Sequence, residues 1–246
     1  MDGIEFHQLV RTFQNVEALP QLPDSAIRLV QACDDDDATI HDAEVVVASD
    51  PGLTAMVIRT ASTARFMSMG GPATTVSASV MRLGLRALKS LAMTHAFRTL
   101  LNQRHESDCY EAARFAKHSV FTGIATQYLF DREYGSRGHD LEEVFTFGLL
   151  HDLGTCLFAN VAPGLFDECW QRAERNSTTF DAAFHSTYNE PLATLGWAAA
   201  SAWNLPEIFV EFLHTRSQRD EPSDLQAVED IVATAEVFAP TFGYAL

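Results

Sequence analysis

Positive charge is scarce in this sequence. Its 246 residues include 17 Lys and Arg against 33 Asp and Glu, which gives a formal net charge of −16. Residues 1–105 hold 11 acids and 9 bases, whereas residues 106–246 hold 22 acids and 8 bases, so the second half carries −14 of this charge. Because a field of this sign repels phosphate backbones, we expect no direct binding to nucleic acid. Solubility or a basic partner is the simpler interpretation.

Paired cysteines and long apolar runs are also missing. The four cysteines (Cys33, Cys109, Cys156 and Cys169) show no CxxC spacing, so neither a zinc knuckle nor a disulfide framework is indicated. No apolar run approaches the roughly 18–20 residues that a membrane helix needs. The first ten residues, MDGIEFHQLV, lack the basic start of a signal peptide. We therefore expect a cytoplasmic protein that does not interact with membranes.

Strand signals are absent as well, since no segment alternates strictly between apolar and polar residues. The apolar positions from Val76 to Leu101 recur at helical spacings, with Gly84 marking a boundary. Asp50 followed by Pro51 is typical of a capped helix start. Further helices are expected at 25–33, 40–48, 53–64, 110–130, 192–203, 207–214 and 225–238, before His151, and near Ala182. The sequence predicts an all-α fold with a joint at Asn102–Asp108.

One motif carries unusual chemistry. Leu149–Gly154 reads LLHDLG and places His151 beside Asp152 at the end of an apolar run. Burying an imidazole and a carboxylate is costly unless each finds a partner. The partner is either a hydrogen-bonding group at a helix junction or a metal ion. The glycines form no phosphate-binding loop and no GxSxG motif is present, which leaves nucleotide binding through a phosphate loop and serine hydrolysis unsupported.

Several motifs in order resemble the HDOD domain family. In the first half these are LPQLP at 19–23, SDPGL at 49–53, and Leu83-Gly84 followed by Leu88. In the second half they are KHS at 117–119, GLLHDLG at 148–154 and WNLPE at 203–207. This family is similar to HD and HD-GYP phosphohydrolases and is usually described as a regulatory output module with decayed catalytic residues. The resemblance implies an N-terminal helical bundle (residues 1–105) packed on an HD-like helical subdomain (residues 106–246).

The resemblance also implies a site for one divalent metal. The simplest HD site takes a His, an adjacent His-Asp pair and a distant Asp. By motif, these positions fall on His118, on His151 and Asp152, and on Glu236, which is one methylene longer than the expected Asp. Two imidazoles and two carboxylates suit iron, manganese, cobalt, nickel or zinc.

The extra histidines of HD-GYP enzymes have no counterpart here. Leu192 stands where one His is expected, and Arg216 and Ser217 stand where a His–His pair is expected, with His214 two residues away. The Gly243-Tyr244-Ala245 segment lies at the C-terminus and lacks the proline of a GYP signature. A two-metal site, which would polarise both the attacking and the leaving oxygen, is therefore not expected.

These observations favour a bacterial signal-transduction module that binds a signalling protein or a small ligand without turnover, and we assign no residue as catalytic. The alternative is a mononuclear phosphohydrolase using His118, His151, Asp152 and Glu236. Lys117 is the one basic residue counted in the motif helices, which argues against phosphate binding. A third alternative is a structural adaptor whose remnant pocket is filled by side chains.

Overall fold

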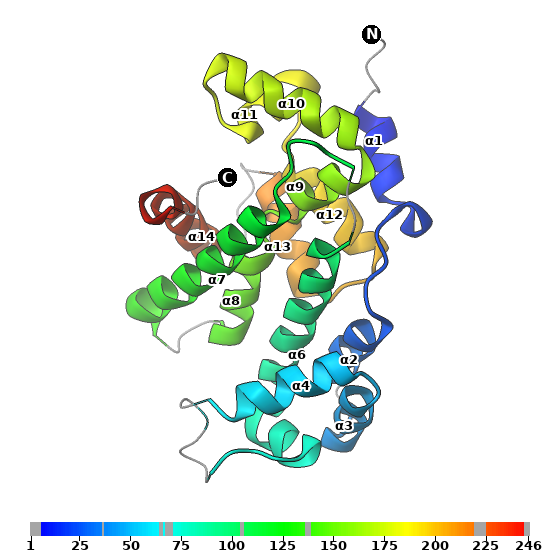
Figure 1. The fold of residues 1–246 in the computed structure, drawn as a ribbon. Helices are drawn as coiled ribbons and strands as arrows, with labels where there is room; N and C mark the ends of the chain where they lie inside the picture. The colour runs from blue at the N-terminus through cyan, green and yellow to red at the C-terminus, as the bar shows by residue number, and fades with distance from the viewer. Residues whose placement is uncertain are drawn as a thin grey trace.

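The computed structural model describes residues 6–35, 37–63, 66, 71–103, 106–135, 139–218 and 225–243. These residues form helices, turns and loops and no strand, which confirms the predicted all-α fold. In the first half, three helices pack around a long fourth one (Figure 1). The elements of this half are α1 (Phe6–Phe13), η1 (Val16–Ala18), α2 (Asp24–Asp34), α3 (Ile40–Ala48), α4 (Pro51–Ala61) and α6 (Val76–Leu101).

The second half is built on the pairing of α7 (Ala112–Tyr134) with α8 (Leu141–Leu150). The chain continues through α9 (Leu153–Val161), α10 (Pro163–Asn176), α11 (Phe180–Tyr188), α12 (Ala193–Ala202), α13 (Glu207–Ser217), α14 (Gln226–Phe238) and η2 (Ala239–Phe242). Helix α14 lies along α7, while α12 packs on both α9 and α13. Helix α1 also packs on α12, so this N-terminal helix contacts the second half.

The best-signalled helices lie where the sequence predicts them. Helix α3 has the expected bounds, and α6 spans Val76–Leu101 with a kink at Gly84, whose φ of 73° suits a residue without a side chain. Helix α4 begins at Pro51 with Asp50 as its cap. Helices α1, α9 and α10 are not among those that the sequence predicts.

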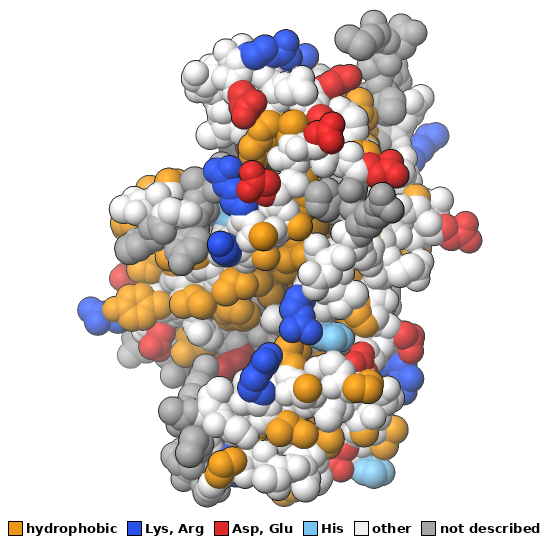
Figure 2. Space-filling model, in the orientation of Figure 1, with side chains coloured by type: hydrophobic (Ala, Val, Ile, Leu, Met, Phe, Trp, Pro, Cys, Tyr) orange, Lys and Arg blue, Asp and Glu red, His pale blue; other side chains and the backbone are white. Residues whose placement is uncertain are grey.

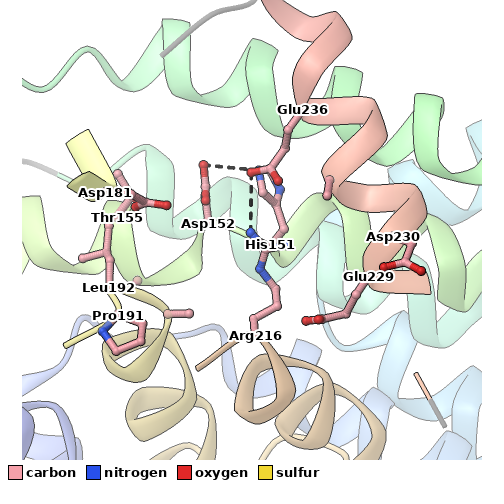
Figure 3. Close-up of a pocket in the computed structure, with 13 residues that line it drawn as sticks. His151, Asp152, Thr155, Asp181, Pro191, Leu192, Arg216, Glu229, Asp230 and Glu236 are labelled. Atoms are coloured by element: carbon pink, nitrogen blue, oxygen red, sulfur yellow. Dashed lines mark hydrogen bonds and ion pairs between the residues drawn. The ribbon is translucent and has the colours of Figure 1, made fainter. Parts of the chain in front are cut away.

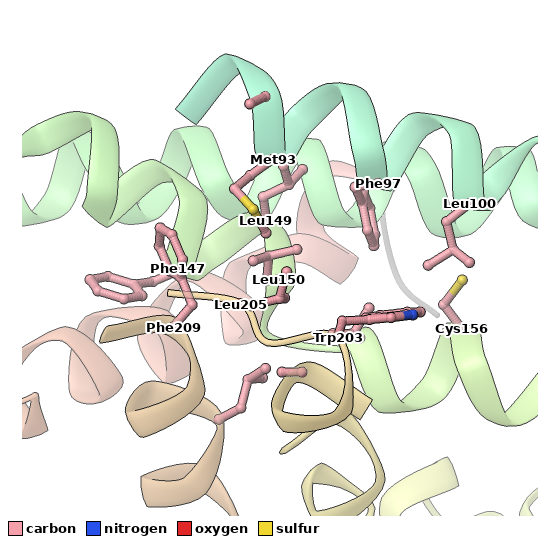
Figure 4. Packing of buried hydrophobic residues seen from close by; sticks show 14 of the residues in the cluster. Met93, Phe97, Leu100, Phe147, Leu149, Leu150, Cys156, Trp203, Leu205 and Phe209 are labelled. Carbon is pink, nitrogen blue, oxygen red and sulfur yellow. The ribbon is translucent and has the colours of Figure 1, made fainter. Parts of the chain in front are cut away.

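A buried apolar cluster joins the two halves (Figure 4). Met93 and Phe97 of α6 pack beside Leu149 and Leu150 of α8, and the cluster extends to the turn after α12. In that turn Trp203 and Leu205 are 7% and 8% exposed, so both belong to the core. The end of α8, where His151 follows, is thus anchored in the core.

Lys89 of α6 forms ion pairs with residues of both halves. The helical spacing of Arg82, Arg86 and Lys89 favours a solvated face, but this interpretation is wrong for Lys89, which is 9% exposed. Its Nζ lies 2.6 Å from Asp34 Oδ1 and 3.8 Å from Glu143 Oε1. The physical reason is that the part of α6 after the kink packs between α2 and α8.

Within the described residues, Leu141–Val161 is apolar and long enough to pass as a membrane span, with a mean hydropathy of 1.3. The expectation of no such run is therefore too strict. However, 78% of this stretch is buried inside the protein, and a turn at His151 and Asp152 divides it into α8 and α9. A buried core helix pair accounts for its composition.

On the surface, apolar side chains gather over α7 (Figure 2). Val120, Ile124 and Tyr128 follow one another at four-residue spacing on this helix and are 43%, 56% and 60% exposed. Val237 and Phe238, at the end of the neighbouring α14, are 74% and 47% exposed. Contiguous exposed apolar side chains of this kind are typical of protein contact surfaces.

Two glycines let α7 and α8 approach each other closely. A Cβ atom on Gly148 would lie 2.7 Å from Thr126 Oγ1 and 2.8 Å from Gly123 Cα. A Cβ atom on Gly123 would lie 3.0 Å from the Phe145 carbonyl oxygen. The backbones therefore touch at this crossing, where no larger side chain fits without movement of a helix.

We expect Gly148→Ala to lower the free energy of unfolding by about 1–3 kcal/mol, because the added methyl overpacks the α7–α8 contact. Urea denaturation measures the change. Gly164→Ala is the matched control, since a Cβ on that helical glycine meets no atom within 4 Å; it should be neutral or slightly stabilising. Equal destabilisation by both substitutions would contradict the close-packing argument.

Asp50 fixes the start of α4 and links it to two other helices. Its Oδ1 accepts hydrogen bonds from the backbone N–H groups of Gly52 and Leu53. Its Oδ2 accepts one from the Ser25 hydroxyl and lies 3.3 Å from His95 Nε2. Burial alone would raise the pKa of Asp50, but these hydrogen bonds and the nearby His95 lower it below its ordinary value.

Because the folded-state pKa of Asp50 is depressed, its contribution to stability is present above the unfolded-state pKa and is lost as the pH falls through the folded value. We expect Asp50→Ala to lower the free energy of unfolding by about 1–2 kcal/mol at pH 7. The loss should be smaller at acid pH, where Asp50 is protonated in the unmodified protein as well. Denaturant titrations of both proteins across this range measure the difference. Asp24→Ala, at a side chain that is 85% exposed, should show little change, and a pH-independent cost for Asp50→Ala would contradict the argument.

Candidate metal centre

The structure brings three of the four predicted metal ligands together and places the fourth, Glu236, beside one of them. His118 lies in the first half of α7, His151 and Asp152 form the junction between α8 and α9, and Glu236 lies on α14. The side chains of His118 and His151 are 7% and 0% exposed, and those of Asp152 and Glu236 are 17% and 30% exposed. The two carboxylates therefore lie on the solvent side of two buried imidazoles.

The donor atoms of His118, His151 and Asp152 converge on one point. The His118 and His151 Nε2 atoms are 3.1 Å apart, and Asp152 Oδ2 lies 3.5 Å and 3.2 Å from them. Glu236 Oε1 lies 3.3 Å from His151 Nε2. Asp152 is the N-cap residue of α9 but makes no capping hydrogen bond, so its carboxylate is available to this cluster.

These separations match the shell of a single metal ion. With bonds of about 2.1 Å, neighbouring ligand atoms lie about 3.0 Å apart in an octahedral shell and about 3.4 Å apart in a tetrahedral one. Among the described residues, His118, His151 and Asp152 are the group whose ligand atoms lie close enough to hold an ion. The residues present thus fit one divalent metal, and Glu236 is in reach of His151 as the additional carboxylate.

The backbone sets the orientation of His151. Its Nδ1 lies 2.7 Å from the Gly148 carbonyl oxygen. Since a carbonyl only accepts hydrogen bonds, Nδ1 carries the proton, and in the neutral ring Nε2 presents its lone pair to the cluster. A second contact of this kind on the far ring nitrogen is usual for histidines that ligate metals.

The electrostatics of the cluster favour a positive charge at its centre. Burial would lower the pKa of His151, but Asp152 and Glu236 raise it to about 10. Burial would raise the pKa of Asp152, but His151 and His118 bring it well below its ordinary value. Burial likewise opposes ionisation of Glu236, while Arg216 and His151 lower its pKa. A metal ion would replace the His151 proton, since metal ligands must be deprotonated.

Arg216 is the residue that sequence reasoning missed. It lies in the last turn of α13, and its Nη2 is 3.5 Å from Glu236 Oε1. The sequence motifs indicate Lys117 as the one basic residue of the motif helices. This is wrong for the site, because the guanidinium of Arg216 lines the same cavity as His151 and Asp152. The available signal was its position, where the HD-GYP comparison expects a metal-ligating histidine.

Two cavities meet over the cluster, and Figure 3 shows the residues that line the first. The first, of about 390 Å³, is lined by His151, Leu192, Arg216 and several carboxylates. The second, of about 570 Å³, is lined by His118 and by Trp170 and Phe180 at the other end. The two share the residues Asp152, Thr155, Asp181, Ala233 and Glu236. A purely structural adaptor would have this pocket filled by side chains, and the two cavities show that it is not filled.

Other histidines and the buried Cys156 have structural contacts. His95 contacts Asp50, and the ring of His139 packs against Phe130 and Phe147. Cys156 is fully buried and its pKa is raised by burial to about 12, as expected for a structural thiol. His105, Tyr244 and Ala245 lie outside the described residues.

Solved structures share this fold at low sequence identity. An HDOD domain protein of unknown function from Geobacter sulfurreducens matches with a TM-score of 0.76 and 21% identity, over 98% of this chain and 81% of that one. A candidate phosphohydrolase from Shewanella amazonensis matches with a TM-score of 0.71 and 22% identity, over 97% and 82% of the two chains. A candidate signal transduction protein from Marinobacter aquaeolei matches with a TM-score of 0.69 and 20% identity, and this chain spans 53% of its length.

No curated protein matches this sequence. The HDOD domain family model matches residues 19–218, a range that includes His118, His151, Asp152 and Arg216. This match covers most of the sequence and most of both halves of the fold. The chain belongs to the HDOD family.

Proposed function

We propose that this chain is a cytoplasmic bacterial signal-transduction module that binds one divalent transition metal and a small ligand in the pocket above it. The metal ligands would be His118, His151, Asp152 and Glu236. Ligand occupancy would be passed on through contact with a protein partner, without turnover. The observation that carries the proposal is the open pair of cavities whose shared wall includes Asp152 and Glu236.

The pocket supports binding more strongly than two-metal catalysis. Leu192 and Arg216 line the first cavity at positions where HD-GYP enzymes are expected to place histidines. An apolar side chain and a guanidinium cannot ligate a second ion. A two-metal clamp on the attacking and leaving oxygens is therefore unsupported.

The surface over α7 supports a protein partner. Val237 of the neighbouring helix α14 is exposed as well, and it also lines the second cavity. The same helices carry His118 and Glu236. A change in the pocket therefore has a short path to this surface.

We expect the purified protein to bind about one divalent transition metal per chain, and His151→Ala to lose it, because His151 is the fully buried donor at the centre of the cluster. Elemental analysis after loading with Mn²⁺, Fe²⁺ or Zn²⁺ and gel filtration measures the stoichiometry. Saturating metal at about 100 times its Kd should stabilise the folded protein by about 2.7 kcal/mol.

The matched control is His185→Ala, which removes an exposed histidine on α11. It should retain the metal and the stabilisation. Metal that persists in His151→Ala, or none in the unmodified protein, would refute the assignment of this site.

A mononuclear phosphohydrolase is the second candidate, and Arg216 is the observation that favours it. A guanidinium beside the metal ligands supplies a cation that can hold a phosphoryl oxygen. In that case the metal would supply a water of lowered pKa. Asp152 would hold the metal and accept a proton.

We expect no metal-dependent turnover of p-nitrophenyl phosphate above the level of Asp152→Asn, because the binding module lacks the second set of ligands. Phosphate release measured with Mn²⁺, Fe²⁺ or Zn²⁺ decides the matter. Turnover that both Asp152→Asn and His151→Ala abolish, and that His185→Ala retains, would favour the hydrolase over the binding module.

A further inference from the structure

Arg216 is a buried cation with incomplete hydrogen bonding. Its side chain is 16% exposed and rises from α13 toward Glu236 (Figure 3). The contact with Glu236 Oε1, at 3.5 Å, is long compared with the about 2.7–2.9 Å of a strong charge-assisted bond. Its Nε has no hydrogen-bond partner among the described residues. A guanidinium offers five donors, so most of its capacity to bind an acceptor remains in the cavity.

One oxygen atom of Glu236 faces both Arg216 and the cluster of predicted metal ligands. The Oε1 atom that faces Arg216 also lies 3.3 Å from His151 Nε2. A metal ion held by His151 and Asp152 would draw on the same carboxylate. The guanidinium and the metal ion therefore compete for Glu236.

The charges of the site favour binding of a cation before binding of an anion. Apart from the imidazoles, the charges of Asp152, Glu236 and Arg216 sum to −1, and a divalent ion makes this end of the cavity more positive even when it replaces a proton on His151. The rest of the first cavity is acidic, because Asp181, Glu229 and Asp230 also line it. Without a metal this cavity repels anions, whereas with one its inner end attracts them.

We infer that Arg216 couples two ligands in this cavity, a divalent cation and an oxyanion. The guanidinium opposes cation binding by holding Glu236, and once the cation engages Glu236 the released guanidinium binds the oxyanion. Each ligand then raises the affinity for the other by the same factor. This inference rests on the metal site of the proposed function and adds the chemical class of the second ligand.

The test is calorimetric titration of the full chain with Mn²⁺, with and without inorganic phosphate. In the unmodified protein, phosphate should tighten Mn²⁺ binding by about three-fold or more, and Mn²⁺ should tighten phosphate binding equally. In Arg216→Gln, Mn²⁺ alone should bind on the order of ten-fold more tightly, because the competing charge is gone. Phosphate should then have no further effect.

Arg216→Lys keeps the charge and should keep the low Mn²⁺ affinity, which separates a charge effect from a packing effect. Arg28→Gln removes the same charge from a side chain that is 49% exposed on α2 and should leave both affinities unchanged. His151→Ala removes a predicted metal ligand, so the heat that remains in its titration measures the direct binding of phosphate to Mn²⁺ in solution. Thermal melting shows that each variant is folded.

Equal Mn²⁺ affinity in Arg216→Gln and the unmodified protein, or a phosphate effect that survives the substitution, would overturn the coupling. The proposed function would still stand if His151→Ala abolishes Mn²⁺ binding. If neither the unmodified protein nor Arg216→Gln binds Mn²⁺, both the coupling and the metal site are wrong.

Discussion

The contact between the backbones of α7 and α8 at Gly123 and Gly148 is the constraint on which the site depends. Gly123 follows His118 by five residues, and Gly148 precedes His151 by three. Because no side chain separates the helices at this crossing, the two imidazoles come to 3.1 Å from each other. The Gly148 carbonyl also fixes the ring of His151. One crossing thus sets both the distance and the orientation of the innermost ligands.

The fold was predictable where local signals are strong. The Asp50-Pro51 start of α4 and the Gly84 kink in α6 each depend on neighbouring residues alone, and both could be placed from the sequence. Helix α9 could not, because α8 and α9 form one continuous apolar run that only the turn at His151 interrupts. Helix α1 is short and owes its place to packing on α12, which is a long-range contact that no local pattern contains.

The residues of the cluster were predictable and the pocket was not. Motif order alone singled out His118, His151, Asp152 and Glu236; the structure brings the first three together and places Glu236 beside His151. The cavities above them depend on how α10, α11 and α14 lie relative to α9, and sequence spacing carries no information on this. The role of Arg216 was hidden for a different reason. Comparison with the HD-GYP motif shows that a histidine is absent at this position, but it carries no information on which residues the Arg216 side chain contacts.

Arg216 bears directly on the proposal that this site binds ligands without turnover. A position that would hold a metal-ligating imidazole instead carries a permanent positive charge next to Glu236. The cation at that end of the pocket is then a side chain of the protein, and no second metal ion has to be bound from solution to supply it. Part of the excess negative charge of the second half also lies inside the cavity, at Asp181, Glu229 and Asp230, so it acts on ligands as well as on solubility. A pocket with a tethered cation among carboxylates favours or disfavours a ligand according to its charge, and the proposed binding module needs this property and no chemical step.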